Sequence, residues 1–171
     1  MSQTAASYVS KYNIAARIFH WVGAALIVAA VVIINQGEEF ISLHKSVGFS
    51  FLIWTVLRLI NRFVSAAPSP VAMSKLQHGL SVAVHGLLYV AMLAMPLTGL
   101  LASMAFGYGV NVFGVLPIAG FATPNDELGS MMMNLHKNLI WPALLALVAA
   151  HILAALYHQF VMKDKLLSRM L

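Results

Sequence analysis

A long apolar run with histidines at both ends constrains this chain more than any other feature of its sequence. The run extends from His136 to His158, contains a third histidine, His151, and is long enough to cross a bilayer as one helix. Ionisable side chains are rare in spanning helices and mark functional positions by default. His136 and His151 lie roughly 22 Å apart along the axis, near opposite faces of a ~30 Å hydrocarbon core. One helix therefore presents a histidine at each of two depths, and the partners must come from other helices.

The amino-acid composition places the chain in a membrane. Of its 171 residues 61% are hydrophobic and 9% are charged, whereas soluble domains average roughly 25% charged residues. The chain has no cysteine, which excludes disulfides, cysteine-ligated iron–sulfur clusters and the thioether attachment of c-type haem. We therefore expect an all-α membrane protein in which residues 1–171 form a single membrane domain.

Four apolar segments predict four transmembrane helices, at about residues 14–34, 44–64, 78–104 and 136–161. A polar linker containing Pro68 and Pro70 separates the second segment from the third, and a longer glycine-rich loop precedes the fourth. Pro142 falls in the first turns of the fourth segment, where a missing backbone N–H costs least. The fold expected from these segments is a four-transmembrane-helix bundle.

Four spans place both termini on one side of the membrane, and the charges indicate which side. Only two of the ten Lys and Arg residues, Lys45 and Lys137, fall on the opposite side, together with four acidic residues. By the positive-inside rule we expect both termini to be cytoplasmic. This topology explains the net charge of +5, so no nucleic-acid partner is expected.

Orientation determines the depth of each histidine. His44 and His136 begin the second and fourth spans at the outer face, whereas His20 and His151 lie in the inner halves of the first and fourth spans. We therefore predict two pairs between helices, His44 with His136 and His20 with His151. Two imidazoles suit a low-spin haem that carries electrons without leaving a coordination site for oxygen. The bundle is thus expected to enclose two haems.

Glycine and arginine residues near the histidines support these pairs. Gly23 follows His20 by three residues and Gly48 follows His44 by one turn, and a glycine lets a flat macrocycle approach the backbone. Ordinary helix packing would use the same glycines. Arg58 is the deepest arginine, and we expect it to pair with a propionate of the inner haem.

Three other histidines leave alternatives open. His158 lies seven residues after His151 on the same helical face, and is the second choice for the inner ligand because its depth is almost interfacial. His85 is expected to point into the bundle at the depth of the inner haem, where it either hydrogen-bonds a propionate or quinone or packs against a neighbour. His78 lies at the inner interface and has no predicted role.

Several short motifs are spread along the chain. They are Ile18-Phe19-His20-Trp21, His44-Lys45-Ser46-Val47-Gly48, Trp54 with Arg58 and Arg62, His85-Gly86-Leu87-Leu88-Tyr89, Met95-Pro96-Leu97-Thr98-Gly99, and His151 with His158, Lys163, Lys165 and Arg169. Together they resemble the bacterial cytochrome b561 family over about residues 12–171. The resemblance implies a four-helix bundle of the bacterial inner membrane with two b-type haems, whose axial ligands are His20, His44, His136 and His151.

One spacing departs from the family pattern. The last two ligands of the family are one residue closer together than His136 and His151 are here. A bulge near Pro142 would absorb the extra residue.

The resemblance also implies an oxidoreductase. Members of this family pass electrons to or from quinone, and superoxide oxidation at the outer face with ubiquinone as acceptor is associated with them. Lys45 and Lys137 directly follow the outer ligands, where they would attract a small anion to the haem edge or anchor the helices at the interface. We expect a di-haem carrier that takes electrons from a periplasmic donor, a small anion such as superoxide or a protein, and reduces ubiquinone. Two alternatives are a membrane-anchor subunit that relays electrons from a bound dehydrogenase or hydrogenase, and a non-redox four-helix membrane protein.

Overall fold

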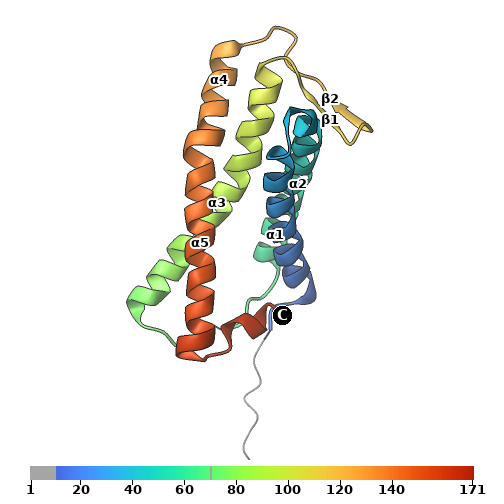
Figure 1. The fold of residues 1–171 in the computed structure, drawn as a ribbon. Coiled ribbons are helices and arrows are strands. Elements are labelled where there is room, and N and C mark those ends of the chain that lie inside the picture. The colour runs from blue at the N-terminus through green and yellow to red at the C-terminus, as the bar shows by residue number, and fades with distance from the viewer. Residues whose placement is uncertain (1–10, 70) are drawn as a thin grey trace, which may run out of the picture.

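Four long helices make up most of the structure, a computed structural model that describes residues 11–69 and 71–171. They are α1 (Ile14–Ile34), α2 (Ile41–Val64), α3 (Lys75–Ala105) and a fourth helix that runs from Asp126 to Met162 (Figure 1). The fourth helix is composed of α4 (Asp126–Asn134), a π-helical segment (Leu135–Ile140), α5 (Trp141–Tyr157) and a second π-helical segment (His158–Met162). Each of the four helices is long and apolar enough to cross a membrane. The predicted fold of four transmembrane helices is confirmed.

Three of the four helices begin before the expected spans, and polar residues before α3 and the fourth helix cap their first turns. A 3-10 turn (Glu38–Phe40) leads into α2. Ser74 and Gln77 form a capping box at the start of α3. The fourth helix begins at Asp126 rather than near residue 136, because the Asn125 side chain accepts the N–H of Leu128 at 2.9 Å.

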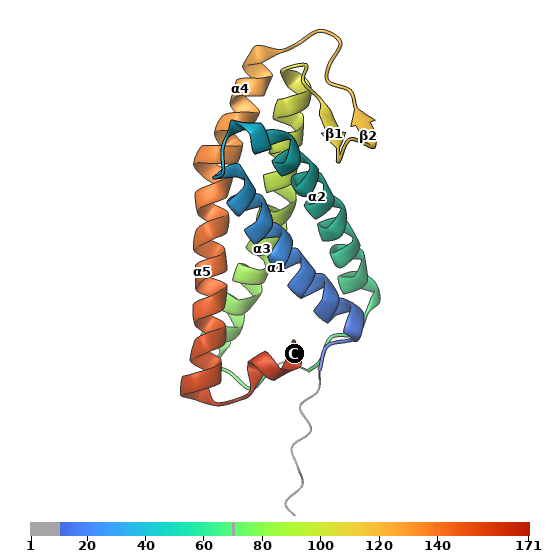
Figure 2. The same cartoon turned by 45° about the vertical axis from the view of Figure 1, so that its right-hand side comes forward.

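The long helices run alternately in opposite directions, so both described ends of the chain lie at one end of the bundle (Figures 1 and 2). We call this the inner end and the opposite one the outer end. In sequence order α1 packs chiefly against α2, α2 against α3, and α3 against α4 and α5. Helices that are consecutive in the chain are therefore neighbours in the bundle, because short connections place consecutive helices side by side and antiparallel.

A return segment, residues 163–171, follows the fourth helix and crosses the inner end to reach α1. It contains the 3-10 turn Leu166–Arg169. Its backbone carbonyls accept three hydrogen bonds from the start of the chain. They come from the Tyr12 N–H to Arg169 at 3.0 Å, from the Trp21 indole N–H to Met170 at 2.8 Å, and from the Lys11 ammonium to Leu171 at 3.1 Å. The return segment therefore ties α1 to the end of the fourth helix.

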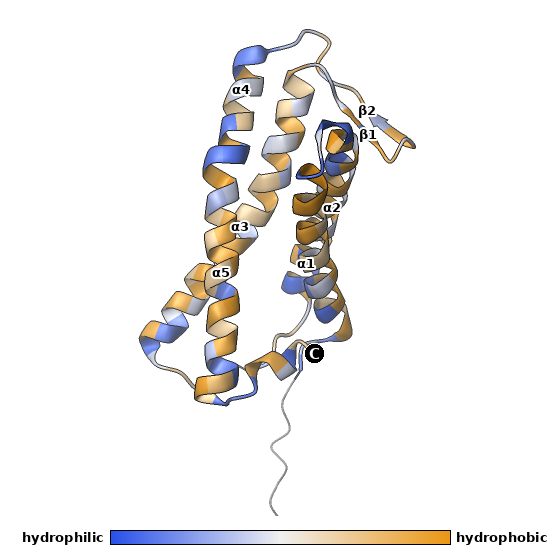
Figure 3. Ribbon diagram, viewed as in Figure 1, coloured by the Kyte–Doolittle hydropathy of each residue, from blue (hydrophilic) through white to orange (hydrophobic). Residues whose placement is uncertain are grey.

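The core of the bundle is small and apolar. Phe51 of α2, Ala91 and Met92 of α3 and Leu144 of α5 form a buried cluster at mid-depth. Hydrophobic residues also cover the outside of the helices along their middle parts, whereas hydrophilic residues gather near their ends (Figure 3). This distribution suits a protein whose outer surface contacts lipid rather than water.

A small hairpin lies at the outer end, in addition to the expected helices. Its strands, β1 (Val110–Val112) and β2 (Leu116–Ile118), are antiparallel. The hydroxyl of Ser46 on α2 is buried and accepts the N–H of Phe113 at 3.0 Å, which fixes the hairpin against the helix. Gly109 precedes β1 with φ of 63°, and a Cβ there would overlap the Ile118 carbonyl oxygen, so a glycine is required.

Replacing Ser46 with alanine should loosen the hairpin without unfolding the bundle. The variant leaves the N–H of Phe113 without its acceptor, which costs on the order of 1–3 kcal/mol. We expect faster amide exchange in residues 110–118, measured by hydrogen-exchange mass spectrometry, and unchanged exchange in the long helices. Ser50→Ala is the control, because the Ser50 hydroxyl donates to the Ser46 carbonyl on its own helix. Equal exchange in the two variants would show that Ser46 does not hold the hairpin.

Candidate functional site

Two histidines from different helices face each other at the outer end. His44 comes from the first turn of α2 and His136 from the π-helical segment, and their ring centroids are 6.5 Å apart with the planes 84° apart. An imidazole nitrogen lies roughly 2 Å from a metal that it binds, so rings on opposite sides of one ion have centroids roughly 6 Å apart. The spacing of this outer pair therefore fits a single metal ion between the rings.

Backbone carbonyls determine the tautomer of both rings in the outer pair. Nδ1 of His44 lies 2.9 Å from the carbonyl oxygen of Ala30, and Nδ1 of His136 lies 2.8 Å from that of Met95. Because a carbonyl only accepts, each Nδ1 carries the proton and donates it, and each Nε2 keeps a free lone pair. Metal-binding histidines typically have this arrangement, in which Nδ1–H donates a hydrogen bond to the protein and Nε2 binds the metal.

A glycine on α3 makes room for the His136 ring. A Cβ added at Gly99 would lie 2.9 Å from Cε1 and 3.1 Å from Nδ1 of that ring. The Thr98 hydroxyl lies 3.3 Å from the same Nδ1. The sequence analysis assigned Gly99 no role at the site. The available signal was a glycine inside an apolar helical stretch, which is unfavourable unless packing requires it.

The π-helical segment that contains His136 ends just before Pro142. Such segments place an extra residue within an otherwise α-helical stretch. Pro142 has no N–H to donate, so the α-helical ladder is already interrupted at this point. The expected irregularity near Pro142 is thus present, and it accompanies the fifteen-residue spacing from His136 to His151.

A second set of histidines lies at the inner end. His20 of α1 and His151 of α5 have ring centroids 6.1 Å apart, with an angle of 56° between the planes. His85 of α3 adjoins His151, with centroids 5.2 Å apart, and its Nδ1 donates to the Ser81 carbonyl at 2.6 Å. The inner pair has the same spacing as the outer one, with a third histidine beside it.

Arg58 determines the tautomer of His20. Its Nη2 lies 3.2 Å from His20 Nδ1, and a guanidinium only donates, so this Nδ1 accepts and the proton of the neutral ring is on Nε2. The guanidinium also lies over the Tyr89 ring, 5.6 Å from its centroid. For His20 to bind a metal through Nε2, Arg58 must release Nδ1. Its guanidinium would then be available to a negatively charged group.

The two predicted glycines have different surroundings. A Cβ added at Gly48, one turn after His44, meets nothing within 4 Å, so this position leaves room for a flat group beside the outer pair. A Cβ added at Gly23 would lie 3.6 Å from the Trp54 ring and 3.8 Å from Arg58 Nη1. Gly23 therefore lies in the packing contact between α1 and α2. Ordinary helix packing was the alternative role that the sequence analysis gave for this glycine.

His158, the second choice for the inner ligand, has another partner. Its Nδ1 lies 2.5 Å from the Asp164 carboxylate, and the residue is only 9% exposed. Asp164 also accepts the N–H of Leu166 at 3.1 Å. This buried hydrogen bond to the return segment favours His151 over His158 as the partner of His20.

An apolar layer separates the inner and outer pairs. The buried cluster of Phe51, Ala91, Met92 and Leu144 lies between them, and Leu144 falls between His136 and His151 on the fourth helix. Among the described residues, no group of three or more His, Asp or Glu side chains is placed to hold a metal ion. Each pair offers two imidazoles, so a metal ion held by either pair would take its other ligands from a bound group such as a porphyrin.

The two lysines predicted to attract an anion lie at the outer end. The ammonium of Lys45 is 5.5 Å from the centroid of the Tyr108 ring, next to the hairpin. Lys137 is exposed. Both cations are adjacent in the chain to a histidine of the outer pair, and only Lys45 is held by an aromatic contact.

Comparison with known proteins finds a family and several relatives. The family described as prokaryotic cytochrome b561 matches residues 11–171. Cytochrome b561 homolog 2 of Escherichia coli (strain K12) is 27% identical over 172 residues, which cover 94% of this chain and 91% of that protein. Cytochrome b561 homolog 1 of the same strain is 38% identical over 88 residues, or 51% of this chain and 48% of the relative. Cytochrome b562 of Cereibacter sphaeroides is 34% identical over 131 residues, or 75% and 66%.

Gly99→Ala should disrupt the outer pair alone, because the added methyl group displaces the His136 ring. We expect the purified variant to bind less haem than the wild type, measured by absorption per protein chain. Gly79→Ala on the same helix is the control, because a Cβ at Gly79 meets nothing within 4 Å. Full haem content in the Gly99 variant would show that the ring tolerates the methyl group.

Proposed function

Because this chain belongs to the prokaryotic cytochrome b561 family, we propose that it transfers electrons through a bacterial membrane by way of two b-type haems. The single observation that carries this proposal is the two histidine pairs, which lie at opposite ends of one bundle with matching ring spacings of 6.5 and 6.1 Å. Cytochromes of this family are membrane proteins that bind haem b. The proposal assigns the outer haem to His44 and His136 and the inner haem to His20 and His151.

The residues around each pair suit this role. When bound, each haem supplies one-electron chemistry at its iron. At the outer end, the carbonyls of Ala30 and Met95 hold both imidazoles through Nδ1, which leaves each Nε2 free to bind a metal. At the inner end, Arg58 would give up its bond with His20 and would be available to a propionate. Two histidines at each site would hold a haem that carries electrons and leaves no position for oxygen.

We assign electron entry to the outer end and exit to the inner end. Lys45 and Lys137 stand beside the outer pair and would attract a small anion such as superoxide. In this reaction two superoxide anions each lose one electron and become dioxygen, and one ubiquinone takes up two electrons and two protons. Near the inner pair, His85 donates its Nδ1 proton to the Ser81 carbonyl, so its Nε2 is free to accept a hydrogen bond and would suit the hydroxyl group of a quinol. The excess of cations at the inner end supports cytoplasmic termini.

A membrane-anchor role is the second candidate, in which a bound dehydrogenase or hydrogenase supplies the electrons. Family membership decides against the non-redox alternative. The purified chain distinguishes the two remaining roles. Reduction of a soluble ubiquinone analogue by a superoxide-generating system, with no other protein present, supports the oxidoreductase. Haem reduction only after addition of a partner protein supports the anchor subunit.

Single substitutions of the four histidines should remove the haems in pairs. We expect His44→Ala and His136→Ala to remove the same haem, and His20→Ala and His151→Ala to remove the other. Low-temperature absorption and potentiometric titration of each variant would identify the missing haem. The wild-type protein should contain two haems per chain. Loss of the inner haem in His158→Ala but not in His151→Ala would show that the inner ligand is His158, two helical turns after His151.

The double variant Lys45→Gln with Lys137→Gln should slow haem reduction by superoxide severalfold at low ionic strength. Removing both cations weakens the attraction of the anion, which salt screens over roughly 10 Å at 0.1 M. The salt dependence of the rate, measured by stopped-flow absorption, should flatten while both haem spectra stay unchanged. Arg62→Gln with Lys75→Gln removes two cations from the inner end and serves as control. An unaltered rate in the outer variant would argue for a docked protein donor.

A further inference from the structure

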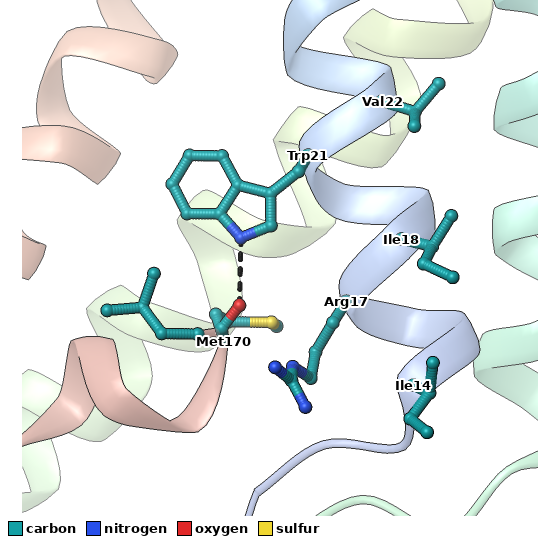
Figure 4. Close-up of a pocket in the computed structure, with 7 residues that line it drawn as sticks. Ile14, Arg17, Ile18, Trp21, Val22 and Met170 are labelled. Atoms are coloured by element: carbon teal, nitrogen blue, oxygen red, sulfur yellow. Dashed lines mark hydrogen bonds between the residues drawn. The ribbon is translucent and has the colours of Figure 1, made fainter.

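A groove on the lipid-facing side of the inner end has no role in the electron path. It lies between the first two turns of α1 and the end of the return segment, and has a volume of about 500 Å³. Figure 4 shows its lining, which consists of Ile14, Arg17, Ile18, Trp21, Val22, Met170 and Leu171. Ile14 and Ile18 are 71% and 50% exposed, so the groove opens toward the surroundings of the bundle rather than toward the histidines.

Among the described residues that line this groove, Arg17 has the one charged side chain. Its side chain extends toward Met170, below the Trp21 ring (Figure 4). The Nε atom is buried and has no hydrogen-bond partner among the described residues. The acidic residue of the inner end, Asp164, is engaged by His158. A guanidinium against an apolar wall without a partner is unfavourable unless an anion supplies the missing acceptors.

We propose that this groove binds an anionic phospholipid, with the phosphate on Arg17. A guanidinium binds phosphate through two parallel hydrogen bonds, which would satisfy the buried Nε–H. Ile18 and Val22 follow Arg17 toward the middle of α1 and offer an apolar track for an acyl chain. Trp21 lies at the depth where indole rings border the headgroups. The cations of the inner end add a field that attracts anionic lipid.

The bound lipid would join two parts of the protein that otherwise meet through few contacts. Its phosphate would lie on α1, while its glycerol and chain would lie against Met170 and Leu171 of the return segment. The bond from Trp21 to the Met170 carbonyl already connects these parts. The lipid would therefore stabilise the return segment on α1. An uncharged quinone ring fits the apolar wall but does not neutralise Arg17.

Native mass spectrometry of the full-length haem-loaded protein tests the proposal. Detergent-purified protein is mixed with phosphatidylglycerol or with phosphatidylcholine, and the retained lipid is counted. We expect wild-type protein to retain phosphatidylglycerol severalfold better, Arg17→Gln to lose this preference, and Arg17→Lys to keep part of it. Arg62→Gln is the matched control, because it removes an inner-end cation outside the groove and should behave as wild type. Haem content reports separately on the proposed function and should be unchanged in all variants.

A second variant tests the apolar wall without altering the charge. Ile18→Trp fills the groove from a half-exposed position and should reduce lipid retention severalfold, even if Arg17→Gln proves unstable. Equal retention by Arg17→Gln and wild type, or equal loss in Arg62→Gln, would overturn the proposal. Displacement of phosphatidylglycerol by ubiquinone would assign the groove to quinone. Displacement by millimolar inorganic phosphate would assign Arg17 to a soluble anion.

Discussion

The hydrogen bond from His136 to the Met95 carbonyl joins α3 to the fourth helix and orients the ring on which the outer pair depends. Gly99 lets the two helices approach closely enough for this bond. The bond holds His136 opposite His44, and the π-helical segment around it sets the register of the residues that follow. His151 reaches the depth of His20 because the fourth helix is positioned at this point. This contact therefore positions the outer pair directly, and it bears on the inner pair only through the register of the fourth helix.

The two ends of the bundle prepare their histidines by different means. Backbone carbonyls orient the outer pair, and such dipoles change little when a cofactor binds. The inner pair is oriented by the Arg58 side chain, a cation that also contacts Tyr89. The two pairs thus differ in the groups that orient their imidazoles, which are neutral backbone dipoles at the outer end and a charged side chain at the inner end.

The number and direction of the helices, and the depths of the histidines, could be predicted because they follow from segment length, charge asymmetry and a fixed rise per residue. His44, His136, His20 and His151 were paired on that basis alone. The carbonyl partners, the role of Gly99 and the bond between Arg58 and His20 depend on helix packing, which periodicity does not determine. The hairpin was missed because its strands are three residues each. The hydrogen bond from His158 to Asp164 could not be predicted, because it depends on the path of the return segment.

The arrangement of the pairs bears on how the protein is made. Each pair takes one histidine from the α1–α2 hairpin, which is synthesised first, and one from the fourth helix, which is inserted last. Neither site exists until the whole chain is in the membrane, so a haem cannot be captured by both ligands before that moment. Since α1 packs chiefly against α2, a group held by either pair would join the first helices directly to the last, in addition to the packing through α3.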